Sequence, residues 1–166
     1  FYEINYYEDA IYEIDRFILN YPNHKNIAYA HFLRAICFFE SVVDEKKDLK
    51  PILSAEKEFN YIIKNYPNTD FSLDAKFKLN LIDNIMASKE LYIGKYYLSK
   101  KKWIPALNRF KNIVNNYEQT EYIEEALHRL VEINYKIGLK EESQKYASLL
   151  GYNYLSSEWY KKSYKV

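Results

Sequence analysis

The residues best suited to binding chemistry are gathered in one short stretch, Gly94–Phe110, which reads GKYYLSKKKWIPALNRF. It holds two adjacent tyrosines, three consecutive lysines, a tryptophan and an Asn-Arg pair. Lysines that neutralise phosphates beside rings that stack on bases would suit a nucleic acid. The alternative is an exposed turn between two helices, with the aromatic side chains packed beside it. We favour the turn, because three lysines without a larger basic face give only weak, salt-sensitive binding.

Arg109 is the first candidate for contact with a protein partner. It immediately precedes the predicted core residue Phe110 and lies off the apolar stripe, so we expect it to be exposed. A guanidinium group pairs with carboxylates through two parallel hydrogen bonds, and arginine is frequent at interface hot spots.

His31 and Arg34 form a second candidate site. They lie one turn apart on a predicted helix and could together hold the carboxylate of a peptide. Simple surface polarity is the alternative interpretation of the same two residues.

Nothing in the sequence favours catalysis, a cofactor or a metal. The three histidines, His24, His31 and His128, are scattered, and no HExxH, GxSxG, P-loop or GxGxxG motif occurs. Cys37 is the only cysteine and lies in the apolar run RAICFFES, so we interpret it as a small core residue. We predict that His128 is a partly buried structural histidine.

The composition favours a helical protein. The 166 residues are 48% hydrophobic and include only three glycines and four prolines, too few for the many turns of a β-sandwich or barrel. The formal net charge of +1 gives no global attraction to nucleic acid or to an anionic membrane surface. The sequence begins FYEINYYEDA without an initiator methionine, so we expect an N-terminally truncated chain.

An internal repeat organises the chain. Four segments align without gaps, and in each a small residue stands eleven positions before a tyrosine. Positions 0, 4, 7 and 11 of each segment fall on one face of an α-helix. The small residues are Ala10, Ala55, Ala106 and Ser143, and the tyrosines are Tyr21, Tyr66, Tyr117 and Tyr154. A proline after the first two tyrosines ends the helix there.

A second helix precedes most of these segments. Alanines follow the first three tyrosines by nine positions, at Ala30, Ala75 and Ala126. Small residues at fixed points let paired helices approach closely, and stacked pairs bury what one pair cannot. The pattern is similar to the tetratricopeptide repeat (TPR), whose period is about 34 residues.

We therefore predict an all-α fold, an α-solenoid of TPR-like antiparallel helix pairs forming one domain over residues 1–166. The predicted repeats are 1–22 (partial), 23–67, 68–118 and 119–155, with a tail at 156–166. Two insertions lengthen the spacing: a charged surface loop at Asp44–Pro51, and one extended helix from about Ser72 to about Ser99.

Local signals refine these boundaries. Thr120 precedes acidic residues and is predicted to cap the next helix, which Gly138 should end. Gly94 interrupts the extended helix and marks a close contact or a bend. We expect Trp159 and Tyr160 in the tail to pack against the last repeat; contact with lipid headgroups is the alternative.

With the repeats in register, the chain resembles the BamD family, the TPR lipoproteins of the outer-membrane β-barrel assembly machinery. The resemblance rests on KELYIGKYYLSKKKWIPALNRFKNIVNNY and on EALHRLVEINYKIGLKEESQKYASLLGYN, and the tail is similar to the α-proteobacterial branch. Its specific part is Glu90, Tyr96-Tyr97, Trp103, Ala106 and Asn108-Arg109. Ordinary TPRs require neither the Tyr-Tyr nor the Asn-Arg pair.

The resemblance implies a non-catalytic scaffold on the periplasmic face of the outer membrane. Such a scaffold binds the periplasmic POTRA region of BamA and accessory lipoproteins, with contacts expected at Tyr97, Trp103, Asn108 and Arg109. It would reach the membrane only through a lipidated N-terminal cysteine that this chain lacks. Unfolded barrel substrates are a doubtful partner here, because the first repeats, implicated in their recognition, are partly absent.

A generic TPR adaptor or peptide-binding co-chaperone is the alternative function. It would share the helix pairs but not the Tyr-Tyr, Trp and Asn-Arg cluster. A nucleic-acid-binding domain is less favoured, because 24 basic residues are balanced by 23 acidic ones.

The repeat register predicts that Ala106→Phe destabilises the protein by roughly 1–3 kcal/mol, since a large ring would overpack the contact between two helices. Urea unfolding of the variant and the parent chain measures this difference. An unchanged unfolding curve would show that the register is wrong.

Overall fold

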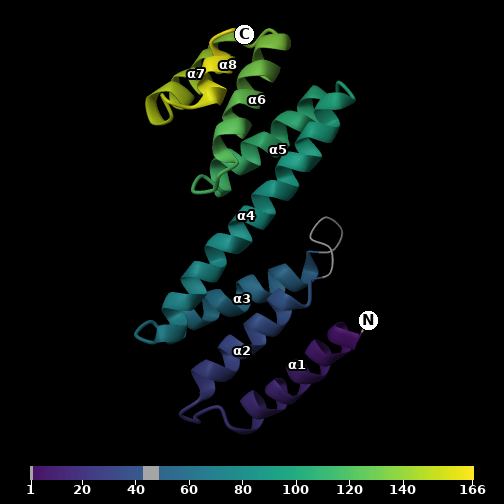
Figure 1. Ribbon diagram of the computed structural model, residues 1–166, viewed down its shortest axis with the longest axis vertical. Helices are drawn as coiled ribbons and strands as arrows, with labels where there is room; N and C mark the ends of the chain where they lie inside the picture. The colour runs from purple at the N-terminus through teal and green to yellow at the C-terminus, as the bar shows by residue number, and fades with distance from the viewer. Residues whose placement is uncertain (1, 43–48) are drawn as a thin grey trace. The chain divides into compact units, whose positions relative to one another are not determined.

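The computed structural model describes residues 2–42 and 49–166. These residues form eight α-helices and no strand, in the order shown in Figure 1. The helices are α1 (Tyr2–Asn20), α2 (Ile27–Glu40), α3 (Lys50–Asn65), α4 (Asp70–Ser99), α5 (Trp103–Asn116), α6 (Ile123–Lys136), α7 (Lys140–Asn153) and α8 (Glu158–Ser163). Across the described ranges, no helix is both long enough and apolar enough to cross a membrane.

Several helices pack on their neighbour in the chain. α1 contacts α2 and α2 contacts α3, while α5 contacts α6, α6 contacts α7, and α8 lies on α6 and α7. The predicted all-α, TPR-like helix pairs are confirmed, as is the extended helix, which is α4 with 30 residues. The contacts divide the chain into two compact units, residues 1–82 and 83–166, with the boundary inside α4. The single domain and its repeat boundaries stay predictions.

The first unit is built on the small residues of the repeat. Ala55 and Ala75 are fully buried and let the apolar side chains of neighbouring helices meet. Phe59 and Ile62, four and seven positions after Ala55, are also fully buried, as their places on the stripe predict. Cys37 is buried with them, which confirms its place in the core, and burial raises the pKa of its thiol.

The second unit has one main core cluster from α4, α5 and α6. Ala106, Phe110 and Ile113 supply the stripe of α5, and all three are fully buried. Ala87 and Leu91 of α4 face them, and α6 closes the cluster. The cluster comprises Ala87, Leu91, Ala106, Leu107, Phe110, Ile113, Ala126, Leu130 and Ile133.

The turn between α4 and α5 is the exposed lysine turn that the sequence predicts. Lys100, Lys101 and Lys102 are all exposed, and their backbone amides donate to the last carbonyls of α4. Lys101 has a φ of 56°, in the left-handed region that few non-glycine residues adopt. This conformation reverses the chain within three residues, so α5 begins beside the end of α4.

Three of the predicted boundaries can be compared with the structure. Pro51 lies in the first turn of α3 and Gly138, with φ 87°, follows the end of α6, both as predicted. Residues 44–48 of the predicted charged loop lie outside the described residues. The prediction for Thr120 is wrong: α6 begins at Ile123, and the Thr120 hydroxyl donates to the Tyr117 carbonyl at 2.7 Å within the preceding turn.

The C-terminal tail packs against the last repeat. Trp159 and Tyr160 of α8 are half-buried against the cluster of Ile123, Leu127 and Leu150. His128 is 4% exposed, lies 2.8 Å from the Ser163 hydroxyl through Nδ1, and has its ring 5.2 Å from that of Trp159. Burial lowers the pKa of His128. The predicted structural role of this histidine is confirmed.

Gly94→Ala should destabilise the protein, although alanine favours a helix over glycine by about 1 kcal/mol. A Cβ at position 94 would lie 2.7 Å from Cε1 and 2.8 Å from Cζ of Phe110, whose ring is fully buried and cannot retreat. We expect overpacking of roughly 1–3 kcal/mol, measured by urea unfolding.

Gly151→Ala is the matched control for that variant. Its Cβ would lie 2.7 Å from Cε2 of Tyr160, but that ring is only half-buried and can give way. The loss of stability in Gly151→Ala should therefore be smaller than the loss in Gly94→Ala. Equal losses, or a gain at position 94, would contradict the tight contact between α4 and α5.

Candidate functional site

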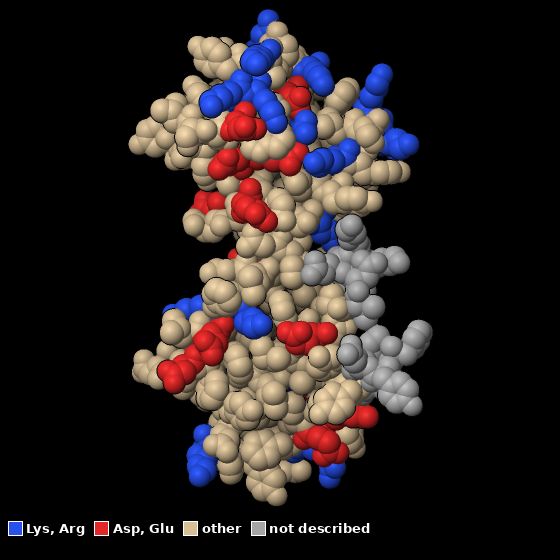
Figure 2. Space-filling view, viewed as in Figure 1, with Lys and Arg blue, Asp and Glu red and all other residues tan. Residues whose placement is uncertain are grey.

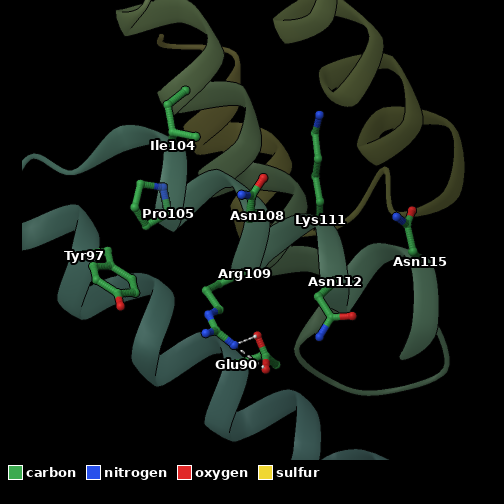
Figure 3. A pocket seen from close by; sticks show the side chains of 9 residues that line it. All are labelled: Glu90, Tyr97, Ile104, Pro105, Asn108, Arg109, Lys111, Asn112 and Asn115. Carbon is green, nitrogen blue, oxygen red and sulfur yellow. Dashed lines mark hydrogen bonds and ion pairs between the residues drawn. The ribbon is translucent and has the colours of Figure 1, made fainter.

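A polar groove lies between the C-terminal half of α4 and the exposed face of α5 (Figure 3). It encloses about 570 Å³. Its lining residues are Glu90, Tyr97, Ile104, Pro105, Asn108, Arg109, Lys111, Asn112 and Asn115.

The packing of the two helices brings the charged residues of the groove together. Gly94 lies against the ring of Phe110, so the two helices approach closely at that level. Glu90 lies one turn before Gly94 on α4, and Arg109 is the neighbour of Phe110 on α5. The same contact that buries Phe110 therefore holds the side chains of Glu90 and Arg109 within reach of each other.

Glu90 and Arg109 form an ion pair in the groove. Nη1 of Arg109 donates to both carboxylate oxygens of Glu90, at 3.0 and 3.2 Å. The Glu90 side chain is 14% exposed and that of Arg109 is 41% exposed. Within the described residues, only Nη1 of the guanidinium makes a hydrogen bond. The remaining donors of Arg109 are thus available at the surface to a carboxylate or carbonyl of another molecule.

Two other predicted contact residues share the groove with Arg109, and one does not. Tyr97 and Asn108 line it. Trp103 packs instead against the core cluster of α4, α5 and α6, and Nζ of Lys136 lies 5.7 Å from its ring centroid. Trp103 is half-buried and contributes to the packing of the unit, not to the lining of the groove.

Glu90 is one of the groove residues that were not predicted as contact residues. It belongs to the cluster on which the resemblance to the BamD family rests, and one signal could have revealed its role. It stands four residues before Gly94 on α4, so it shares the face that meets α5. A carboxylate at that position needs a cation on α5, and Arg109 is the one that reaches it.

His31 and Arg34 belong to a second ion-pair network, in the first unit. Nδ1 of His31 lies 3.1 Å from Glu58, and Arg34 pairs with Glu58 at 2.8 Å and with Asp15 at 2.5 Å. His31 is only 6% exposed, so surface polarity does not describe it. A peptide carboxylate at these residues stays a prediction, and it would have to compete with Glu58 and Asp15.

The two networks occupy equivalent places in the repeat. Glu58 stands three residues after Ala55, and Arg109 stands three residues after Ala106. Each reaches a residue of opposite charge on the preceding helix. No group of three or more metal-ligating side chains occurs among the residues that the structure describes.

The paired helices and their small contact residues define a TPR-like helical-repeat protein. A family model described as YfiO, outer membrane lipoprotein, matches residues 1–149. The chain therefore belongs to this family of outer-membrane lipoproteins.

Relatives named outer membrane protein assembly factor BamD support the assignment. The chain is 38% identical over 160 residues to that of Rickettsia prowazekii and 37% identical over 162 residues to that of Caulobacter vibrioides. These alignments cover 96% and 98% of this chain but 64% and 53% of the relatives. A more distant relative, from Xylella fastidiosa, is 28% identical over 170 residues, with 96% of this chain and 58% of the relative covered.

The burial of the ion pair predicts an asymmetry between its two partners. Arg109→Met leaves the carboxylate of Glu90, which is 14% exposed, without its cation, so we expect a loss of about 1–3 kcal/mol in the free energy of unfolding. Glu90→Gln should cost less, because the half-exposed guanidinium can be solvated by water. Urea unfolding at pH 7 measures both.

Arg16→Met is the control for these two variants. Arg16 pairs with Glu13 at 3.1 Å on the surface of α1, with side chains 58% and 66% exposed. Arg16→Met should lower the free energy of unfolding by no more than about 0.5 kcal/mol. Equal effects of Arg16→Met and Arg109→Met would show that the Glu90 pair contributes no more than a surface pair.

Proposed function

We propose that this chain is part of an outer-membrane protein assembly factor and acts there as a non-catalytic scaffold. The relatives carry the name of such a factor, and the family is one of outer-membrane lipoproteins. The proposed location is the periplasmic face of the outer membrane, with a lipid anchor in the full-length protein.

The α4–α5 groove is the proposed contact with the POTRA region of BamA. The observation that carries this proposal is the hydrogen bonding and the exposure of the Arg109 guanidinium. Its guanidinium is oriented by Glu90 through one nitrogen, while its other donors lie at the surface of a polar groove. An arginine already ordered in this way loses less side-chain entropy on binding than a freely rotating one. Tyr97 and Asn108 border the same groove and extend the contact.

Other functions find less support in the molecule. A nucleic acid needs a continuous basic surface, whereas acidic side chains lie among the lysines and arginines in Figure 2. A generic TPR adaptor or peptide-binding co-chaperone would not need the Glu90–Arg109 pair. Accessory lipoproteins of the assembly machinery are further proposed partners of the remaining helix faces.

Calorimetric titration of the chain with the soluble POTRA region of its own BamA tests the proposal. Arg109→Gln should raise Kd by about tenfold or more, as expected for an arginine hot spot. Arg16→Gln, a paired arginine 58% exposed on α1, should leave Kd unchanged. Higher salt should weaken the parent complex more than the Arg109→Gln complex, because a charged contact is screened.

Two results would count against the proposal. The first is tight binding that Arg109→Gln leaves unaffected, which would move the interface to another face of the chain. The second is the absence of binding to a folded POTRA region, which would leave the generic adaptor as the better function.

A further inference from the structure

The exposed face of α5 carries a row of three asparagines along the groove. Asn108, Asn112 and Asn115 all line it. At 3.6 residues per turn, the three lie within about 60° of one another around the helix axis. Figure 3 shows Asn108, Asn112 and Asn115 in order along α5, while Arg109 points toward Glu90.

The carboxamides have hydrogen-bonding capacity that the protein does not use. Among the described residues, Asn108 and Asn115 make no side-chain hydrogen bond, and Asn112 only accepts one, from Nδ2 of Asn116. Each carboxamide carries two N–H donors and a carbonyl acceptor, the same groups as a peptide bond. The row can therefore pair with main-chain amides and carbonyls without reading any side chain.

The spacing of the row suits an extended chain. Asn108 and Asn112 are separated along the helix axis by about 6 Å, at 1.5 Å per residue. Peptide groups that point to the same side of a strand repeat about every 6.7 Å. A strand lying along α5 would thus present every second peptide group to Asn108 and Asn112.

The charge of the groove favours an acidic segment. The carboxylate of Glu90 is already satisfied by Arg109. Lys111 lies on the other edge of the asparagine row, and Figure 3 shows its side chain extending away from that pair. No ion pair involves Lys111 among the residues described. The groove thus keeps one uncompensated positive charge beside a row of main-chain-like groups.

We propose that the groove on α5 binds an extended, acidic segment of the partner subunit through its main chain. Asn108 and Asn112 pair with alternate peptide groups that point to the same side of the segment, and Lys111 attracts a carboxylate of the segment. This inference rests on the proposed function, because it specifies how the partner occupies the same groove.

A set of nine-residue peptides tests the inference, each blocked at both ends. The parent peptide alternates threonine and alanine around a central glutamate. The second peptide has the same side chains with N-methyl groups on alternate peptide nitrogens, and the third has glutamine in place of the glutamate. Fluorescence anisotropy with a terminal label measures Kd for the whole chain and its variants.

Main-chain recognition predicts a specific pattern of losses. N-methylation should raise Kd at least tenfold for the parent protein and less than twofold for the double variant Asn108→Ala/Asn112→Ala. The glutamine peptide should bind about threefold to fivefold more weakly than the glutamate peptide. That difference should disappear in Lys111→Gln.

Asn116→Ala is the matched control on the same helix. It removes the hydrogen bond to Asn112 but leaves all three groove asparagines in place, so peptide binding should not change. Circular dichroism of each variant checks that the helices are retained. We expect no loss of helix, because Asn108 and Asn115 are exposed and Asn112 is half-buried.

Three results of the peptide experiment would overturn the inference. These are no peptide binding at millimolar concentration, an equal effect of N-methylation in the parent and the double variant, and equal binding of the glutamate and glutamine peptides. The last would assign the groove to extended chains in general. A POTRA region that depends on Arg109 but not on Asn108 and Asn112 would uphold the proposed function and still overturn this inference.

Discussion

The close contact between Gly94 and Phe110 is the constraint on which the groove depends. A Cβ at position 94 would lie 2.7 Å from the ring, so α4 and α5 meet at a distance that only glycine permits. The ring is fully buried by the same contact and fixes the rotation of α5. Because Arg109 is the residue just before Phe110, the direction of its side chain follows from that rotation. The polar site is therefore positioned by the apolar core beneath it.

The ion pair between Glu90 and Arg109 stabilises the unit and also leaves hydrogen-bond donors exposed at the surface. Glu90 is mostly buried and needs a cation, whereas the 41% exposed Arg109 side chain would remain solvated without its partner. One nitrogen of the guanidinium satisfies both oxygens of the carboxylate, which leaves the other donors at the surface. A single residue can thus stabilise the unit and still offer an oriented contact to another molecule.

The repeat explains why the fold could be predicted and why the site could be predicted only in part. The steps of four and seven residues after Ala55 and Ala106 locate Phe59, Ile62, Phe110 and Ile113, because burial follows the period of the helix. The repeat does not set the sign of the charge at a given position, as Glu58 and Arg109 show, so Glu90 was not predicted as a contact residue. The prediction for Thr120 was wrong for a local reason, because its hydroxyl donates to the Tyr117 carbonyl and does not cap a helix N-terminus.

The two equivalent ion-pair networks show how one scaffold can treat the same position differently. Glu58 is enclosed by Arg34 and His31, whose side chains are 19% and 8% exposed, so that network is closed upon itself. Arg109 occupies the corresponding place with the opposite charge and faces a single partner. Reversing the sign puts the longer, more strongly donating side chain on the later helix of the pair, where it lines the groove. The difference in accessibility thus arises from the order of the two charges along the chain, on helix pairs that the repeat builds alike.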